Sequence, residues 1–455
     1  MDTNIFREYD IRGIVGRQLT DETVNLLGRG IASFFRQKGA RRVAIGYDAR
    51  KSSPRFFHIL AEAFTASGLD VVQIGMVPTP VLYHTLFTVD VDGGVMITGS
   101  HNPPDHNGLK ICLGKQALFG SQIREIRDII LAEQYQSGNG TVEKREVLET
   151  YVSDIANRIA LGTRKIKAVV DAGNGMGGVT AVPVYEQLGI EIVPLFIEPN
   201  PTFPNHHPDP TVTENLQDLI AAVRKHNADI GIAFDGDADR IGVVDETGRI
   251  IWGDELMVLL SRSVLKDHPG ATIIAEVKCS QTLFDDIEKS GGVPLMWKAG
   301  HSLIKAKMKE TGALLAGEMS GHIFFADRFY GFDDATYAGA RVFEILSNAD
   351  QKLSEMLADL PKTYSTAELR VDCADEIKFE VVEEVAAQYA RDHEVITIDG
   401  ARILFDGGWG IVRASNTQAL LVLRFEAATQ AKLEQIKAQV EASVAAAIEQ
   451  QLASF

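Results

Sequence analysis

The fold is organised around the stretch Gly94-Val95-Met96-Ile97-Thr98-Gly99-Ser100-His101-Asn102-Pro103. Its apolar first half predicts a short buried strand, because an apolar run bounded by glycine is typical of strands covered on both faces. Ser100 then lies where this strand ends, which is where ligands bind in open α/β sheets. Gly99 lets the backbone turn without a Cβ clash, and Pro103 and Pro104 keep the turn from continuing as a helix. The sequence therefore predicts a serine at the tip of a stiff loop.

Strands and helices alternate before this loop. Thr20 precedes a helical pattern as its N-cap, and Pro54 occupies the first turn of the next helix, which stops at Gly68. Apolar runs at 43–46 and 71–75 are typical of buried strands. The resulting β-α-β-α-β order predicts a doubly wound sheet with helices on both of its faces.

The chain has 455 residues, which is too long for a single hydrophobic core. Two further α/β units follow, and each again ends a strand in a polar loop that contains glycine, at Asp235 and at Glu318. The last unit differs, because strands surround one helix and precede a long final helix, as in an α+β sandwich with a mostly antiparallel sheet. We expect three consecutive doubly wound, mixed α/β domains and a C-terminal α+β domain, arranged around one central cleft. The expected domains are 1–145, 146–249, 250–362 and 363–455, with a hinge at 361–365.

Composition excludes several classes of function. The net charge of −17, with no basic run, opposes binding to nucleic acid, and it means that a bound anion needs local cations. Cys112, Cys279 and Cys373 lie far apart, which indicates neither a disulfide framework nor a zinc site. No segment has the pattern of a signal core or the apolar length of a membrane span. We therefore expect a cytoplasmic protein without a nucleic acid or membrane partner.

The most specific local motif is Asp235-Gly236-Asp237-Ala238-Asp239-Arg240, which follows a strand expected at 229–234. Three carboxylates at alternate positions after a buried strand are unfavourable unless a cation lies among them. Ligation by oxygen atoms alone suits a hard ion such as Mg²⁺. We therefore predict that Asp235, Asp237 and Asp239 bind a metal, and that Arg240 contacts a phosphoryl oxygen facing the same ion.

Other interpretations of this turn involve different chemistry. A calcium EF-hand loop also needs acids at alternate positions, but Arg240 stands at the sixth position, where that loop requires glycine, and the flanking segments are strand-like. An aspartyl nucleophile of the D-x-D phosphatase kind would make Asp235 the group that attacks phosphate. A solvated acidic turn is the remaining structural interpretation.

Ser100 has no evident base in the sequence. It does not stand in a G-x-S-x-G motif, and we expect the adjacent His101 to point to the opposite side of an extended loop. Such a serine is a weak hydrolytic nucleophile, but it fits a phosphate carrier whose phosphate binds a metal. No G-x-x-x-x-G-K-[ST] loop occurs, so a nucleoside triphosphate site is not indicated. The structural alternative is an ordinary turn rich in serine and asparagine.

Four motifs, taken in order, resemble the α-D-phosphohexomutase superfamily, most closely its bacterial phosphomannomutase/phosphoglucomutase members. They are the Ser100 loop, D-G-D-A-D-R at 235–240, G-E-M-S-G-H at 317–322 and R-A-S-N-T at 413–417. The resemblance covers the whole chain. It implies that Ser100 is phosphorylated and passes its phosphoryl group to a hexose 1-phosphate, which gives a bound 1,6-bisphosphate such as glucose 1,6-bisphosphate. It also implies that this intermediate turns over and returns its other phosphate to the serine.

The resemblance implies roles for individual residues. Asp235, Asp237 and Asp239 would hold Mg²⁺ together with the Ser100 phosphate. Cations offset the charge of a transferring phosphoryl group, and the expected catalytic residues are Ser100, Lys110, Arg240 and His301. The expected substrate-binding residues are Tyr9, Arg12, Lys278, His301, Glu318, Ser320, His322, Arg413, Ser415, Asn416 and Thr417. Several of them also have structural interpretations: the loop with Tyr9 and Arg12 as a solvated surface turn, and Glu318 as a surface acid. His301 has one as a histidine that starts a helix, and His322 as a hydrogen-bonded loop histidine.

The leading hypothesis is an isomerase that interconverts the 1- and 6-phosphates of mannose or glucose. Within the family, the G-E-M-S-G-H form favours these unmodified hexoses over glucosamine phosphate. The alternatives are phosphoglucosamine mutase-type specificity, a D-x-D phosphatase, and a non-enzymatic protein that binds sugar phosphate or calcium. We expect a monomer whose partners are phosphorylated hexoses.

Overall fold

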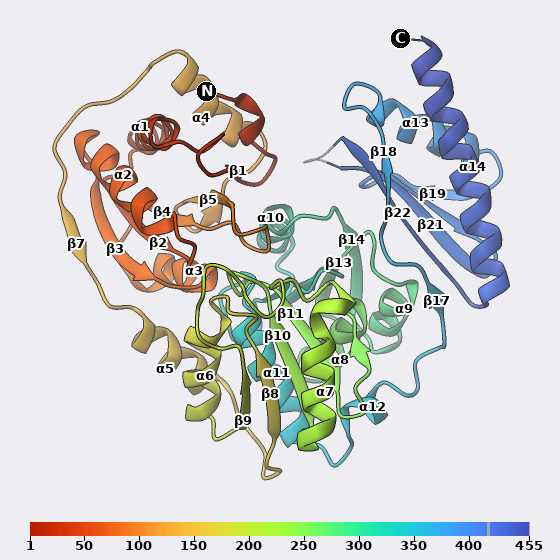
Figure 1. Cartoon of the computed structure of the whole chain (residues 1–455). Helices are drawn as coiled ribbons and strands as arrows, with labels where there is room; N and C mark the ends of the chain where they lie inside the picture. The colour runs from red at the N-terminus through yellow and green to blue at the C-terminus, as the bar shows by residue number, and fades with distance from the viewer. Residues whose placement is uncertain (416–418, 455) are drawn as a thin grey trace.

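The first unit is a mixed sheet with helices on both faces, at the upper left of Figure 1. The computed structural model describes residues 1–415 and 419–454. The elements of this unit are β1 (Ile11–Ile14), α1 (Asp21–Gln37), β2 (Arg42–Tyr47), α2 (Ser53–Ala66), β3 (Asp70–Met76), α3 (Thr79–Thr88), β4 (Gly93–Ile97), β5 (His106–Leu113), β6 (Gln116–Ala117), α4 (Ser121–Leu131) and β7 (Val142–Lys144). The sheet order is β1-β5-β4-β2-β3-β7, and β6 pairs with β5.

Residues of β2 show how the first sheet is covered on both sides. Val43 and Ile45 join an apolar cluster with α1, α2 and α4, whereas Ala44 belongs to a cluster that includes residues of α3. Adjacent side chains of a strand point to opposite faces, so this alternation places helices on both faces, as expected. The expected N-cap is also confirmed, because Thr20 Oγ1 accepts a hydrogen bond of 3.1 Å from the Thr23 amide.

The second unit has a five-stranded sheet in the order β12-β11-β10-β8-β9. Its elements are α5 (Leu148–Arg158), β8 (Lys167–Asp171), α6 (Gly177–Gln187), β9 (Glu191–Leu195), α7 (Gln217–His226), β10 (Ile230–Phe234), β11 (Ile241–Asp245) and β12 (Ile250–Ile251). Strands β8, β9 and β10 run parallel, and β11 pairs antiparallel with β10. The acidic turn 235–240 thus joins two neighbouring antiparallel strands that are buried along their whole length.

The third unit has a four-stranded sheet in the order β14-β13-β15-β16. Its elements are α8 (Gly253–Asp267), β13 (Thr272–Glu276), α9 (Gln281–Lys289), β14 (Val293–Trp297), α10 (His301–Thr311), β15 (Leu315–Gly317), β16 (Ile323–Phe325), α11 (Ala335–Ser347) and α12 (Leu353–Met356). Strands β13, β14 and β15 are parallel, and β16 returns antiparallel to β15. The loop 318–322 therefore connects a parallel strand to a neighbouring antiparallel strand, as the acidic turn does in the second unit.

The fourth unit, at the upper right of Figure 1, is an antiparallel sheet with helices on one face. Its elements are β17 (Tyr364–Ser365), β18 (Leu369–Asp372), α13 (Lys378–Tyr389), β19 (Glu394–Ile396), β20 (Ala401–Phe405), β21 (Gly408–Ala414), β22 (Leu420–Ala427) and α14 (Gln430–Ser454). Helices α13 and α14 share one apolar cluster with β20, β21 and β22. On the other face, Trp409 and Ile411 pack against Val277 of the third unit. The expected α+β unit is confirmed.

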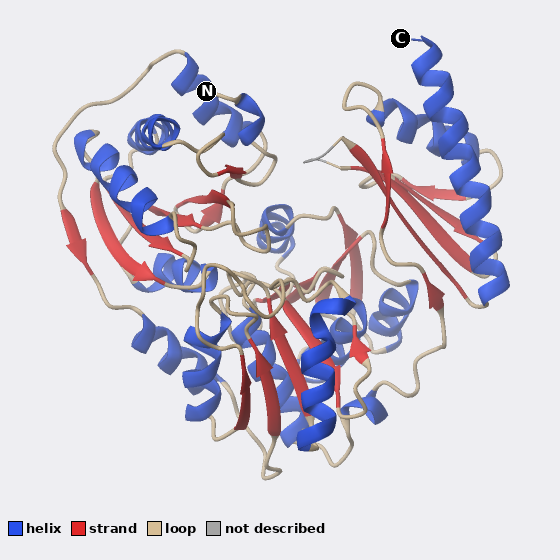
Figure 2. Ribbon diagram, viewed as in Figure 1, coloured by secondary structure: helices blue, strands red, loops and turns tan. Residues whose placement is uncertain are grey.

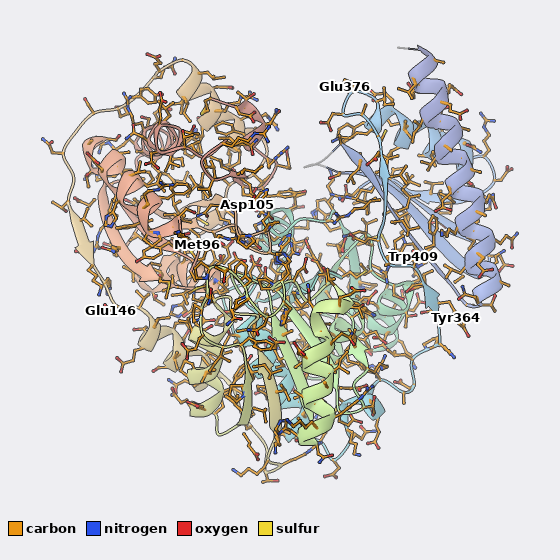
Figure 3. The ribbon with its side chains drawn as sticks, in the orientation of Figure 1. Met96, Asp105, Glu146, Tyr364, Glu376 and Trp409 are labelled. Carbon is orange, nitrogen blue, oxygen red and sulfur yellow. The ribbon has the colours of Figure 1, made fainter. Side chains whose placement is uncertain are left out.

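One large apolar cluster runs through the first three units, from β2 and β3 to α11 and α12. Figure 2 shows loops from these units gathered at the middle of the molecule, where several strands end. In Figure 3, Glu146 marks the connection from β7 to α5, and Tyr364 marks the chain where it leaves the third unit for the fourth. Within the described ranges 1–415 and 419–454, every helix is too short or too polar to cross a membrane.

Candidate active site

Ser100 lies directly beyond β4 in a strained conformation. Its φ is +48°, a left-handed value that costs a residue other than glycine of order 1–3 kcal/mol. Gly99 does avoid a Cβ clash, because a Cβ there would lie 2.5 Å from Cζ of the buried Arg50, but the left-handed φ belongs to Ser100. The chain therefore turns at the serine itself, which is buried at 3% exposure.

The prediction that His101 points away from Ser100 was wrong. Ser100 Oγ and His101 Nδ1 lie 3.1 Å apart, within hydrogen-bond distance. Alternation of adjacent side chains holds for extended backbone, and the left-handed φ of Ser100 breaks it. Burial, and then the charge of Arg240, lower the pKa of His101 well below its usual range. Ser100 thus has a neutral imidazole beside its hydroxyl.

Ser100 meets the acidic turn of the second unit across 135 residues of sequence. Its Oγ donates a hydrogen bond of 3.0 Å to Asp235 Oδ2. The approach is close enough to require Gly236, because a Cβ there would lie 2.2 Å from the Ser100 carbonyl oxygen. The packing of the first two units therefore brings the serine to the predicted metal ligands.

The three carboxylates of the acidic turn fit a small divalent cation. Asp235, Asp237 and Asp239 are fully buried, and each offers a ligand oxygen within 4.8 Å of the other two. Among the described residues, neither Asp237 Oδ1 nor Asp239 Oδ1 accepts a hydrogen bond, although both atoms are buried. Buried carboxylate oxygens without donors favour a cation, and a donor set of oxygen alone is the one that Mg²⁺ prefers.

Lys110 supplies a positive charge to the same carboxylates from β5. Its Nζ donates to Asp237 Oδ2 at 2.7 Å and also contacts Asp239 Oδ2. Burial opposes the charged form of Lys110, but the two carboxylates outweigh it and raise the pKa of the ammonium group. Burial likewise opposes the charged form of Asp237, and Lys110 lowers the pKa of that carboxyl below its usual value. In contrast, burial and the negative charges of Asp237 and Asp239 raise the pKa of Asp235.

Arg240 joins the acidic turn to the loop 318–322 of the third unit. Arg240 and His322 form an isolated antiparallel bridge, and Arg240 Nε donates to His322 Nε2 at 2.9 Å. Gly321 permits this approach, because its φ is +92° and a Cβ there would lie 2.3 Å from the Ile241 carbonyl oxygen. The contact makes Nε2 an acceptor, which leaves the proton of a neutral His322 ring on Nδ1.

Asp333 lies among the basic side chains of the third unit, and the sequence analysis missed it. Its Oδ2 is 3.0 Å from His322 Nδ1 and 3.9 Å from His301 Nδ1, and its Oδ1 accepts a hydrogen bond of 2.7 Å from Lys305 Nζ. The two histidine rings stack at 5.6 Å. Burial, followed by the charge of Lys305, lowers the pKa of His301 well below its usual range. Asp333 stands in no motif, so only the fold reveals it.

The predicted sugar-contacting residues of the third unit form a second cluster. Ser320 Oγ donates to Glu318 Oε2 at 2.9 Å, and Glu318 Oε1 accepts from the Gly300 amide at 2.7 Å. Lys278 pairs with Glu368 of the fourth unit, and the carboxyl group of Glu276 lies 3.5 Å from the same ammonium. Burial is the main cause that raises the pKa of Glu276 to about 7.

A chain of hydrogen bonds connects the first unit to the fourth through Ala299. Tyr9 Oη donates to the Ala299 carbonyl at 3.0 Å, and the Ala299 amide donates to Asp399 Oδ2 at 3.0 Å. Arg413 Nε donates to the same carboxylate at 2.6 Å. Arg413 is therefore held by Asp399 and faces the third unit.

The remaining predicted residues lie in the loops of the first and fourth units. Arg12 Nη1 donates to Asn102 Oδ1 at 2.7 Å, next to the serine. Ser415 follows β21, and its carbonyl oxygen accepts from Lys378 Nζ at 2.6 Å. Asn416 and Thr417, which we also predicted as phosphate contacts, lie outside the described residues.

Family models match each of the four units. Residues 3–137, 149–248 and 252–364 match alpha/beta/alpha domains I, II and III of phosphoglucomutase/phosphomannomutase, and 368–443 match its C-terminal domain. The chain is 47% identical over 439 residues to a phosphomannomutase/phosphoglucomutase of Pseudomonas aeruginosa, covering 96% of this chain and 94% of the relative. It is also 47% identical to a phosphoglucomutase of Neisseria meningitidis, covering 97% and 96%.

A solved structure extends this similarity to three dimensions. The crystal structure of a phosphoglucomutase/phosphomannomutase family protein from Burkholderia thailandensis superposes with a TM-score of 0.93 at 44% sequence identity. The superposition covers 98% of each chain. The arrangement of all four units is therefore shared with that protein.

Proposed function

The chain belongs to the phosphoglucomutase/phosphomannomutase family, and we propose that it interconverts the 1- and 6-phosphates of mannose and glucose through a phosphoserine at Ser100. One observation supports the serine chemistry most directly: Ser100 Oγ lies 3.0 Å from Asp235 Oδ2, although the two residues belong to different units. A phosphoryl group on that oxygen would stand beside three carboxylates suited to Mg²⁺. When bound there, Mg²⁺ neutralises charge on the phosphoryl oxygens.

Two transfers make up the proposed reaction. In the first, a sugar hydroxyl oxygen bonds to the phosphorus on Ser100, the bond from phosphorus to Oγ breaks, Oγ takes up a proton, and the hydroxyl proton passes to a base. The sugar then carries two phosphates and turns over in the site. In the second transfer, Ser100 Oγ gives up its proton and bonds to the other phosphorus, the bond from that phosphorus to the sugar oxygen breaks, and the sugar oxygen regains a proton. The product leaves with its single phosphate at the other position.

The chain's own side chains supply charge and protons for these steps. Lys110 is a buried cation beside the acidic turn and Arg240 is a half-buried cation at its end, and both offset the charge of the moving phosphoryl group. His101 Nδ1 lies 3.1 Å from Ser100 Oγ and exchanges the serine proton in our proposal. We propose that the stacked pair His301 and His322 accepts the sugar hydroxyl proton in the first transfer and returns it in the second.

Substrate recognition uses the third and fourth units in this proposal. Glu318 and Ser320 would contact sugar hydroxyls from a single loop, which suits an intermediate that binds in two orientations. Arg413 presents a guanidinium that can bind the substrate phosphate that is not being transferred. The other proposed contacts are Tyr9, Arg12, Lys278, Ser415, Asn416 and Thr417.

Further parts of the proposal concern the protein as a whole. We propose glucose 1,6-bisphosphate as the activator that loads Ser100, Mg²⁺ as the cofactor, and action as a monomer in the cytoplasm. The three cysteines are free and buried, which suits a reducing compartment. The proposed domains are 1–145, 146–249, 250–362 and 363–455, with a hinge at 361–365 that lets the last one close on substrate.

Intact-mass measurement tests the phosphoserine, and a coupled assay tests the isomerisation. After incubation with glucose 1,6-bisphosphate, the wild-type protein should carry one phosphate, and Ser100→Ala should carry none. Glucose 1-phosphate and mannose 1-phosphate should each give the 6-phosphate, with Mg²⁺ required. Release of free phosphate without isomer would indicate a phosphatase instead, and turnover of glucosamine phosphate alone would change the substrate assignment.

A further inference from the structure

Arg50 is a fully buried cation beneath the Ser100 loop. It follows β2, and its side chain is 1% exposed. Its Nη2 donates to the carbonyl oxygens of Ser100 at 2.7 Å and Asn102 at 2.6 Å. Its Nη1 donates to the carbonyl oxygens of Pro103 at 2.5 Å and His106 at 2.9 Å. One guanidinium therefore gathers four backbone carbonyls from the loop that carries the serine.

Asp48 holds both the arginine and the start of the loop. Its Oδ2 lies 3.2 Å from Arg50 Nε and accepts the Gly99 amide at 3.2 Å. Its Oδ1 accepts the Arg50 amide at 3.0 Å and Ser53 Oγ at 2.6 Å. The buried positive charge is thus balanced, and its counter-ion is itself fixed by hydrogen bonds at the start of α2.

The second unit closes the loop from the other side. The Phe203 ring lies 5.5 Å from Arg50 Cζ, and His207 Nε2 donates to the His101 carbonyl oxygen. Both residues belong to the proline-rich loop 198–210. The serine loop is therefore clamped between a cation from its own unit and a loop from the next.

Ser100 needs such a clamp because of its backbone. A positive φ at a residue other than glycine persists only where the surroundings over-determine it. The planar fork of an arginine has five donors in fixed directions, whereas a lysine has three donors on one nitrogen. Lysine at position 50 would keep the charge but could not reach four carbonyls spread over seven residues.

We propose that Arg50 is a positioning residue for phosphoryl transfer, which holds the Ser100 loop so that Oγ stays beside Asp235. This inference rests on the proposed function, because it matters only if Ser100 Oγ carries phosphate. The same oxygen must meet two different phosphates in turn, so its position is needed in both transfers. Displacement of a reacting group by about 1 Å lowers a rate by on the order of 100-fold.

The variant Arg50→Lys tests the proposal, with Arg341→Lys as its matched control. Arg341 is equally buried at 1% exposure, but it pairs with Asp327 in the third unit, away from the serine. We expect Arg50→Lys to lower kcat by on the order of 100-fold with KM changed less than about threefold. Arg341→Lys should lower the thermal midpoint comparably and leave kcat within a few-fold of wild type. If Arg50→Lys keeps wild-type kcat, or if both variants lose kcat equally, the proposal is overturned.

Amide hydrogen exchange separates this inference from the proposed function. Without any ligand, peptides covering 98–107 should exchange faster in Arg50→Lys than in wild type and be unchanged in Arg341→Lys. Unchanged exchange in Arg50→Lys would refute the positioning role even if the wild type is an active mutase. A wild-type protein inactive on both hexose phosphates would instead refute the proposed function. Asp48→Asn, which removes the charge of the counter-ion and one of its two acceptor oxygens, gives the same readouts if Arg50→Lys fails to fold. A wild-type loop and kcat in that variant would likewise contradict the proposal.

Discussion

Arg240 Nε donates a hydrogen bond of 2.9 Å to His322 Nε2, and this bond joins the acidic turn of the second unit to the glycine-bearing loop of the third. The arginine always donates, so the imidazole must accept at Nε2 and carry its proton at Nδ1. The Nδ1 atom lies 3.0 Å from Asp333 Oδ2 and 3.6 Å from Asp239 Oδ1. His322 of the third unit is therefore oriented by Arg240 of the second unit, with the Asp333 carboxylate near its other ring nitrogen.

Replacing His322 by asparagine should lower kcat by about 10²- to 10⁴-fold, the usual contribution of a positioned acid or base. The thermal midpoint should change little, because asparagine can still accept from Arg240. The control is His268→Asn, since His268 lies on the surface beside Asp327 and should retain activity. Steady-state kinetics with glucose 1-phosphate check the result, and a kcat within threefold of wild type would remove His322 from the proton transfer.

Removal of divalent cations should abolish isomerisation, and added Mg²⁺ should restore it. A cation that binds only the folded protein also stabilises it, so the thermal midpoint should rise with Mg²⁺ concentration. In Asp237→Asn, which removes one of three buried carboxylates, this rise should be lost. Thermal unfolding with and without Mg²⁺ measures the effect. An equal rise in wild type and variant would place the cation elsewhere.

Gly236→Ala should separate the serine from the carboxylates without changing any charge. A Cβ at this position would lie 2.2 Å from the Ser100 carbonyl oxygen, which forces the two loops apart. We expect a fall in kcat of at least about 100-fold, as for a misplaced reacting group. Gly189→Ala is the control, because its φ of +78° makes alanine strained there although no atom lies near the new methyl group. That control should lose stability and keep kcat. A wild-type kcat in Gly236→Ala, with a lowered kcat in Gly189→Ala, would contradict the prediction.

Stability should depend on pH through His206. Burial lowers the pKa of His206, but the hydrogen bond and charge of Asp171 outweigh it and raise the pKa above the usual 6.5. The folded protein then holds this proton more tightly than the unfolded chain, so the stabilisation is complete below about pH 6.5 and is lost as pH rises through the higher folded value. His206→Gln should flatten the fall of the thermal midpoint as pH rises above about 6.5. An identical pH profile in both proteins would exclude the pair as its source.

The strand ends and their polar loops could be predicted because the patterns are local. An apolar run followed by glycine and a polar group indicates a buried strand that ends at Ser100, at Asp235 or at Glu318. Three alternating carboxylates after such a strand require a cation wherever the turn lies in the molecule, so the Asp235 turn indicated a metal site on its own. The antiparallel return of β5, β11 and β16 after these loops has no comparable local signal, because pairing depends on which strand edge is free.

Contacts between distant residues could not be predicted in this way. Arg50 lies 50 residues from Ser100, and His322 lies 82 residues from Arg240. The sequence around Arg50 contains no motif that marks it as a support for the Ser100 loop. The rule that adjacent side chains point to opposite sides gave the wrong side for His101. That rule assumes extended backbone, whereas the packing of Arg50 and the second unit holds Ser100 at a left-handed φ.

By itself, the sequence of this protein determined the alternation of strands and helices before each polar loop, its four units, and the chemical character of each loop. These features depend on the periodicity of neighbouring residues and on the free-energy cost of burying their polar groups. Only the tertiary structure decided that Ser100 lies 3.0 Å from Asp235, that Arg50 supports the serine loop, and that Arg240 orients His322. The physical reason is that these contacts form where separate units pack, and their distances follow from the shapes of whole buried surfaces.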